Sequence, residues 1–265
     1  MSANCQWYAV TDCRADLIAS QALGLKTFCT DAHRLTILDN SPKDQRDLSR
    51  DIEREADRAN ARYIRIPWDA QNRATANETH ASALEWAWKH VILADRPVYA
   101  VWADMDLFLC APFSVDAWMR GAAIRGWPQD RAQGAIRYVW PGLCAMYLDA
   151  LPAPGQISWW CGTVDGERVD VGGQLAVYLR AHPEVVVKAC RCAPRITRAE
   201  GFAHLPEGAR ASYDDAYRVD VFEGAFLHHV ACTGWDHPAP GMLARKGAWV
   251  REVVAKCASG EWRMP

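Results

Sequence analysis

The chain has 265 residues, half of them hydrophobic, so it can bury a large core. Its formal charge of -2 excludes a global basic field of the kind that attracts nucleic acid or anionic membranes, although a local basic groove stays open. No stretch is apolar for long enough to cross a bilayer, and the first residues lack the basic and apolar segments of a secretory signal. We therefore expect a cytosolic protein that forms one domain over 1–265.

The first part of the chain alternates short apolar runs with stretches of helical period, a pattern typical of parallel strands joined by crossover helices. The pattern predicts strands at 7–11, 35–38, 63–66 and 97–103, with helices at 15–25, 43–61 and 79–94. The run 97–103 is the most apolar of these, as expected for a central strand that is buried on both faces.

The second part is richer in short strands. The sequence predicts strands at 122–124, 136–139, 144–148 and 185–187, a loop at 159–170 and a helix at 172–180. We expect these strands to extend the first sheet in mixed directions. The fold class is therefore α/β, with a three-layer α/β/α arrangement around a mixed, mostly parallel central sheet.

The ten cysteines are scattered through a chain that is large enough to fold without disulfides, so we expect reduced thiols. Only Cys190 and Cys192 lie close together. A structural zinc site of the ribbon or finger type needs two such pairs, and the spacing therefore argues against one.

Asp104 and Asp106 directly follow the apolar run 97–103. Ligands of open α/β sheets bind outside the carboxyl ends of the strands, so this is the expected place for a functional pair. Carboxylate oxygens suit Mg²⁺ or Mn²⁺, and such an ion can neutralise a departing diphosphate. The alternative is an ordinary loop with solvated carboxylates, but the return of the chain to the core at 107–109 favours a site.

Several segments, in this order, resemble the glycosyltransferases of the GT-A fold, which use nucleotide-diphosphate sugars and an Asp-x-Asp metal site. They are Tyr8-Ala9-Val10-Thr11, Leu38-Asp39-Asn40-Ser41, the stretch from His80 to Trp88, Ala103-Asp104-Met105-Asp106, Asp170-Val171-Gly172-Gly173 and Phe226-Leu227-His228-His229. The resemblance implies a Rossmann-like GT-A fold and a hexosyltransferase activity. It also implies a nucleotide-sugar half at about 1–110, an acceptor half at about 111–240 and a C-terminal segment at 241–265.

The resemblance also implies which residues bind the donor, with a UDP-sugar as the expected ligand. Thr11 and Asp39 match the positions that hold base and ribose, and Asp104 matches one that approaches ribose and metal. Asn77 and His80 open a predicted helix, where N–H groups favour phosphate. Asp39 as a turn cap and His80 as a core residue are the alternatives.

For the metal, the resemblance implies direct chelation by Asp106 and a downstream histidine. We expect His228 rather than His229, since strand alternation lets only one of them face the site, and imidazole would favour Mn²⁺ over Mg²⁺. Asp170 is the candidate general base for an inverting transfer, or else a helix cap, and a retaining mechanism stays open.

Trp159 and Trp160 are candidates for stacking on the acceptor, because two adjacent indoles in a loop are difficult to bury together. The acceptor hydroxyl could belong to a glycan, a small molecule or a hydroxylated base in modified, phage-type DNA. A basic groove for DNA would use Arg191, Arg195, Arg198 and Arg210.

Two other functions stay open. One is a sugar-1-phosphate nucleotidyltransferase, although the segment after Thr11 lacks the glycine-rich phosphate loop of such enzymes. The other is a noncatalytic sugar- or zinc-binding module.

Overall fold

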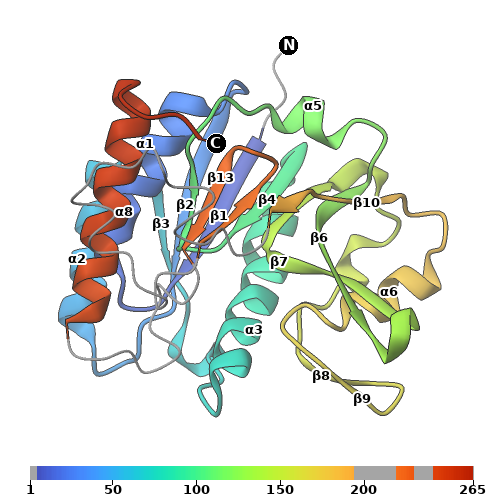
Figure 1. Cartoon of the computed structure of the whole chain (residues 1–265). Coiled ribbons are helices and arrows are strands. Elements are labelled where there is room, and N and C mark those ends of the chain that lie inside the picture. Colours follow the sequence, from blue (N-terminus) through green and yellow to red (C-terminus); the bar gives the residue numbers. More distant parts are fainter. Residues whose placement is uncertain (1–4, 194–218, 230–240, 265) are drawn as a thin grey trace.

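The centre of the molecule is a seven-stranded sheet with the strand order β10-β6-β7-β4-β1-β2-β3 (Figure 1). The computed structural model describes residues 5–193, 219–229 and 241–264. The strands of this sheet are β1 (Cys5–Thr11), β2 (His33–Asp39), β3 (Arg62–Arg65), β4 (Tyr99–Ala103), β6 (Ile124–Arg131), β7 (Ile136–Tyr147) and β10 (Val187–Ala189). β1 to β4 are parallel, and β7 is antiparallel to both β4 and β6. The predicted mixed, mostly parallel sheet is confirmed.

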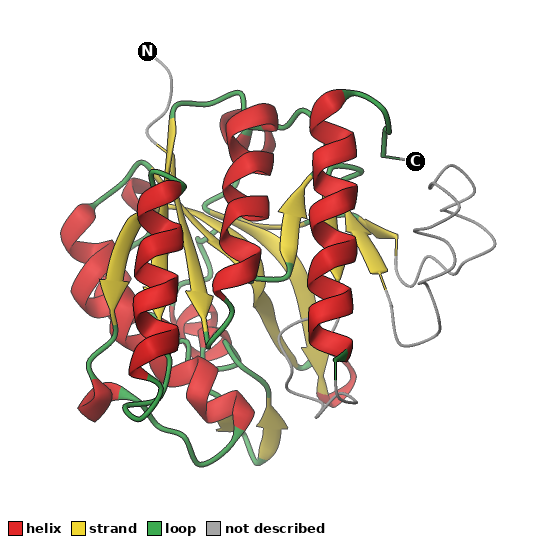
Figure 2. Ribbon diagram, turned by 90° about the vertical axis from the view of Figure 1, so that its left-hand side faces the viewer, coloured by secondary structure: helices red, strands yellow, loops and turns green. Residues whose placement is uncertain are grey.

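Helices cover both faces of the sheet, and those on the left of Figure 1 stand in front of it in Figure 2. The α-helices of the described residues are α1 (Ile18–Phe28), α2 (Arg46–Arg58), α3 (Ala76–Ala87), α4 (Leu93–Asp95), α5 (Val115–Met119), α6 (Leu175–Ala181) and α8 (Met242–Ser259). A π-helical turn, Trp88–Ile92, joins α3 to α4. Within the described ranges, no helix combines the length and the apolar character that a membrane span requires.

A second sheet of four strands has the order β11-β12-β13-β5. Its strands are β11 (Cys192–Ala193), β12 (Val219–Phe222), β13 (Phe226–His229) and β5 (Leu107–Leu109). Because β13 pairs with β5, a segment from the last part of the chain lies beside the segment that follows β4.

Side chains of β1 alternate between two hydrophobic cores, as the pleat of a strand requires. Trp7 and Ala9 lie in the core that α1 and α8 cover, whereas Tyr8 lies in the core that α3 covers. The sheet is therefore buried on both faces, which explains the nearly continuous apolar sequence of β4.

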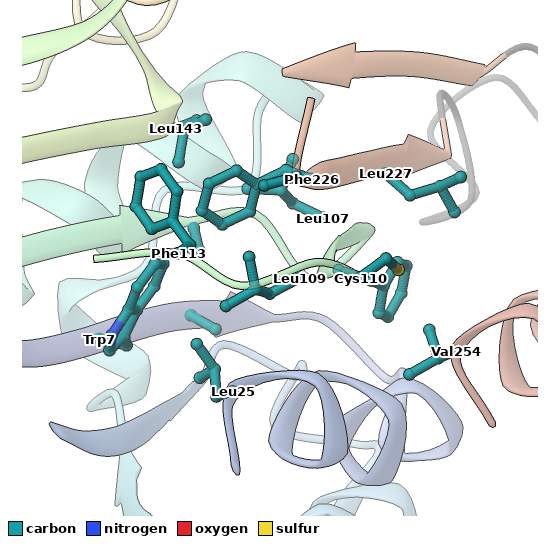
Figure 3. Packing of buried hydrophobic residues seen from close by; sticks show 14 of the residues in the cluster. Trp7, Leu25, Leu107, Leu109, Cys110, Phe113, Leu143, Phe226, Leu227 and Val254 are labelled. Carbon is teal, nitrogen blue, oxygen red and sulfur yellow. The ribbon is translucent and has the colours of Figure 1, made fainter. Parts of the chain in front are cut away.

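Phe226 anchors the second sheet to the first of these cores. Its ring centroid lies 4.7 Å from that of Phe113 and 6.0 Å from that of Trp7. Figure 3 shows these rings beside Leu107 and Leu109 of β5. Burying a side chain of this size contributes about 2–3 kcal/mol, so the contact holds β13 firmly against the turn after β4.

The strands predicted at 136–139 and 144–148 form a single strand, β7, which runs through Pro141. The prediction of two strands was wrong because the β6–β7 register shifts between Gly126 and Trp127, and the shift leaves Pro141 without a ladder partner on β6. A proline is tolerated at such an irregularity, since its missing N–H is not needed there.

The loop predicted at 159–170 contains a hairpin of β8 (Gly162–Val164) and β9 (Glu167–Val169). Its turn is Asp165-Gly166, with φ of 51° and 84°. Asp-Gly is the dipeptide that favours two-residue hairpin turns, so this sequence signal was available and was missed.

Candidate active site

The carboxyl ends of β1, β2 and β4 meet at one edge of the central sheet. Thr11 at the end of β1 is the register partner of Asp39 at the end of β2. Asp104 follows the last residue of β4, and its N–H donates to the Gly142 carbonyl of β7 at 2.9 Å. The predicted donor and metal residues of the three strands are therefore neighbours along this edge.

A tight turn carries Asp104 and Asp106. The Leu107 N–H donates to the Asp104 carbonyl at 3.0 Å, which reverses the chain into β5. Gln21 of α1, only 2% exposed, donates from Nε2 to the carbonyls of Asp104 at 3.0 Å and Leu107 at 3.3 Å. No local sequence pattern marks Gln21, since nothing near it distinguishes it from any other glutamine on a helix.

The structure places His228, rather than His229, at the acidic pair. β13 pairs with β5 so that His228 is opposite Leu107, and its Nε2 lies 3.5 Å from Oδ1 of Asp106. The ring of His229 is fully buried against Trp249 of α8, with centroids 5.0 Å apart. The two imidazoles thus point to opposite faces of β13, as alternation predicts.

His80 meets the other carboxylate of the pair. It lies in the first turns of α3, which Thr75 caps by accepting from the Glu78 N–H at 3.2 Å. Nε2 of His80 lies 3.5 Å from Oδ1 of Asp104, and the two side chains are 18% and 21% exposed. Asn77 is exposed on the first turn of the same helix.

The pKa values of Asp104 and Asp106 are shifted in opposite directions. Burial, with the nearby charges of Asp106 and Asp170, raises the pKa of Asp104 above its usual value. Burial also disfavours the charge of Asp106, but the adjacent His228 holds its pKa below the usual value. Carboxylates that share a site divide in this way, and a bound cation would remove the conflict by allowing both to ionise.

The contact between His228 and Asp106 also shifts the pKa of the His228 imidazole. Burial alone would lower the pKa of His228, but the carboxylates of Asp106 and Asp220 raise it to about 10. A cation at this position would therefore have to displace a proton from His228.

These donors fit a divalent cation with an incomplete set of protein ligands. Oδ1 of Asp106 and Nε2 of His228, 3.5 Å apart, are close enough to contact one ion. In the described part of the chain, no three His, Cys, Asp or Glu side chains already form a ligand cluster, and the Asp104 carboxylate contacts His80. Mg²⁺ and Mn²⁺ commonly take their other ligands from water and phosphate.

Asp39 is fully enclosed. Its Oδ1 accepts from the Ser41 N–H at 2.8 Å and the Ser41 hydroxyl at 2.6 Å. Its Oδ2 accepts from Tyr63 at 2.8 Å and also from Ser49, and it forms an ion pair with Arg65 at 2.5 Å. A carboxylate with no exposed surface and both oxygens occupied holds the loop after β2, so any effect on a ligand would be transmitted through that loop.

Two polar atoms beside Asp39 have unused hydrogen-bonding capacity. Thr11 and Asn40 are each 1% exposed, and within the described residues Oγ1 of Thr11 and Oδ1 of Asn40 are buried without a partner. Arg73 lies next to them and donates to the Asn40 carbonyl at 2.7 Å and to Asp12 at 2.8 Å. Arg73 is a second site residue that no local sequence pattern marks, since the segment after β3 carries no motif.

Asp170 lies in a tight glycine turn. Its backbone N–H donates to the Tyr138 hydroxyl at 3.2 Å, while its Oδ1 accepts from the Val171 N–H at 2.8 Å. Gly172 has a φ of 81°, and a Cβ on Gly173 would lie 2.3 Å from Val169. The turn therefore requires both glycines, and it leaves the Asp170 side chain exposed and near enough to Asp104 to raise its pKa.

The two adjacent tryptophans differ in exposure. Trp159 is fully buried, with its ring centroid 5.8 Å from those of Trp88 and Trp102, so its place in the core contradicts direct stacking on an acceptor. Trp160 is half-buried. Glu85 of α3 fixes this tryptophan loop (residues 158–160) by accepting from the Trp159 N–H at 2.8 Å. The expectation for Trp159 failed because the core beneath the loop encloses one indole completely, while Trp160 packs against that core and stays partly exposed.

The remaining candidates divide by location. Arg195, Arg198 and Arg210 lie outside the described residues, whereas Arg191 is exposed and contacts Glu223 at 3.1 Å. Each cysteine of the described ranges is a free thiol, as expected.

Comparisons with known proteins identify no family. No family model matches the chain, and no curated protein is similar to it. Among solved structures, the chain is similar to glucosyl-3-phosphoglycerate synthase from Mycobacterium tuberculosis in complex with phosphoglyceric acid. The identity is 15%, the match covers 71% of this chain and 69% of that chain, and the TM-score is 0.41. So distant a similarity transfers no activity, and the function has to be inferred from the site.

Proposed function

We propose that this chain is a metal-dependent glycosyltransferase that moves a sugar from a nucleotide-diphosphate sugar, with UDP as the expected nucleotide, to a hydroxyl acceptor. The observation that carries the proposal is the 3.5 Å approach of His228 to Asp106, beside Asp104, at the carboxyl end of a central strand. Oxygen and imidazole donors favour Mn²⁺, with Mg²⁺ as the other candidate.

Asp104, Asp106 and His228 would hold the ion. When bound, it neutralises charge on the departing diphosphate. The buried, unpartnered Oγ1 of Thr11 lies at the edge where a nucleotide would bind, and Arg73 adds a cation there that could pair with phosphate.

In the transfer, the bond between the anomeric carbon and the diphosphate oxygen breaks, and that carbon bonds to the acceptor oxygen. Asp170 is the proposed base that takes the proton of the acceptor hydroxyl, because its carboxylate is exposed and near Asp104. Trp160, the half-buried member of the tryptophan pair, is proposed to stack on the acceptor. Anomeric analysis of the product distinguishes inversion from retention.

The acceptor is proposed to be a glycan, a small molecule or a hydroxylated base in modified DNA. Binding to DNA would weaken steeply as salt rises, because Lys and Arg contacts to phosphate release counterions. Binding to an uncharged glycan would not.

A thermal-shift panel of UDP-sugars, with and without Mn²⁺, tests the proposal, because a ligand of the folded state raises its stability. We expect one donor to raise the melting temperature only with Mn²⁺, and Asp106→Asn to abolish that shift together with UDP release. Asp130→Asn is the control, since that side chain is 59% exposed and has only a 3.4 Å contact with Arg137. An unchanged shift in Asp106→Asn would refute the proposal.

Two further measurements distinguish the alternatives. Pyrophosphorolysis, in which the nucleotide sugar and pyrophosphate give a nucleoside triphosphate and a sugar-1-phosphate, would indicate a nucleotidyltransferase. Tight zinc without affinity for any nucleotide sugar would indicate a noncatalytic module.

A further inference from the structure

The imidazole of His228 lies between two carboxylates. Its Nε2 is 3.5 Å from Oδ1 of Asp106, and its Nδ1 is 3.5 Å from Oδ2 of Asp220. The His228, Asp106 and Asp220 side chains are 11%, 7% and 20% exposed. Nδ1 is buried and makes no closer hydrogen bond within the described residues, so the Asp220 carboxylate is the acceptor available to it.

The backbone fixes this arrangement. Asp220 of β12 is the register partner of His228 of β13 in an antiparallel pair, so the two side chains leave the same face of the small sheet. The same hairpin pairs Phe222 with Phe226, which the core holds in place.

Two aromatic rings pack against the imidazole of His228. The centroid of the Trp140 ring lies 5.1 Å from that of His228, and the centroid of the Phe222 ring lies 5.9 Å away. Rotation of the ring is therefore restricted. The orientation that the packing permits directs Nδ1 to Asp220 and Nε2 to Asp106.

We propose that Asp220 is a positioning residue for the metal ligand His228. By accepting the proton of Nδ1, its carboxylate would keep that proton away from Nε2, whose lone pair is then free for an ion shared with Asp106. Carboxylates that contact the second nitrogen of a ligating histidine fix its tautomer and orientation and raise its basicity. This inference rests on the proposed function, since it gives Asp220 a role at the same metal site.

The test is Mn²⁺ affinity, measured by calorimetry and by the electron paramagnetic resonance of free Mn²⁺ on the full chain without donor. Asp220→Asn should weaken binding about 10–100-fold, as is usual when such a partner is removed. Asp220→Glu should restore part of the loss. Once His228→Ala is present, Asp220→Asn should have no further effect, because the two residues act as a unit.

A matched control is available at the opposite end of the sheet. Asp95 is 17% exposed, pairs with Arg62 at 2.7 Å and accepts from Tyr8 at 3.1 Å, so Asp95→Asn also removes a partly buried, structural carboxylate. It should reduce stability without changing Mn²⁺ affinity. A comparable loss of affinity in this control would show that destabilisation alone explains the effect and would overturn the inference.

The two proposals fail in different ways. If the wild type binds Mn²⁺ and Asp220→Asn binds it within about twofold, the role of Asp220 is refuted while the metal site stands. If the wild type does not bind Mn²⁺ with or without a nucleotide sugar, the metal-dependent function is refuted and the role of Asp220 with it. The positioning role would also be refuted if Asp220→Asn lowered the Mn²⁺ affinity equally in the wild type and in His228→Ala.

Discussion

Replacing Asp39 by asparagine tests whether this residue supports the fold or faces a ligand. The substitution keeps the shape of the side chain but removes the charge that pairs with Arg65 and accepts from Ser41 and Tyr63. The loss from removing one partner of a buried ion pair is about 3–5 kcal/mol. Arg65 is 22% exposed and keeps some water, so we expect the lower end, about 3 kcal/mol.

Urea denaturation at pH 7 measures this loss, followed by tryptophan fluorescence. Asp47→Asn is the control, because Asp47 is 93% exposed, and its 3.0 Å pair with Arg50 should contribute nothing measurable. Equal stability of Asp39→Asn and wild type, together with weaker donor binding, would refute the reasoning and show that Asp39 contacts the ligand.

The pH dependence of the stability difference between wild type and Asp39→Asn provides a second check. Burial opposes the charge of Asp39, but hydrogen bonds from Ser41 and Ser49 and the contact with Arg65 hold its pKa below the ordinary 3.8. The charged form thus stabilises the fold at pH values above the ordinary pKa, and that stabilisation disappears as the pH falls through the lower folded pKa. The difference between wild type and Asp39→Asn should therefore be constant near neutrality and shrink below about pH 4.

Three further predictions concern packing and catalysis. Gly24→Ala should destabilise the fold by about 3 kcal/mol in urea, because its Cβ would lie 2.3 Å from the Leu109 carbonyl, whereas Gly155→Ala, which meets no atom within 4 Å, should be neutral. Glu85→Gln, which weakens the anchor of the tryptophan loop, should raise the KM for the acceptor without changing that for the donor, and a change in donor KM alone would contradict it. Asp170→Asn should slow transfer about 10²–10⁴-fold with Mn²⁺ and donor affinity retained, and a full rate would exclude it as the base.

Local sequence patterns were sufficient to predict much of the central sheet. The apolar run before Asp104 predicted a strand buried on both faces, and β4 is such a strand. A pattern of this kind works because strand period and burial on both faces are properties of a short segment. The same reasoning failed at Pro141, where a register shift in the neighbouring strand removes the need for an N–H.

The contents of the site depended on distant segments. His228 was one of two adjacent histidines in the sequence, and only the pairing of β13 with β5 directs it to Asp106. Asp220 carried no signal until its register with His228 was known, and Gln21 carried none until α1 was placed against the turn.

Burial bears on two predicted site residues, one aromatic and one charged. Trp159 was predicted to face an acceptor, but its ring lies in the core between the π-helical turn that follows α3 and strand β4. For Asp39, a nucleotide contact and a turn cap were both open, and the structure surrounds its carboxylate with Ser41, Tyr63 and Arg65. Whether a side chain is enclosed depends on residues that are distant in the chain.

By itself the sequence determined that the chain forms strands and helices in α/β order and that two carboxylates follow a buried strand, because period, apolar content and turn residues act over a few positions. Only the tertiary structure decided which histidine meets which carboxylate, which tryptophan is enclosed and which groups surround His228. Those contacts follow from sheet order and strand register, which bring together residues that are distant along the chain.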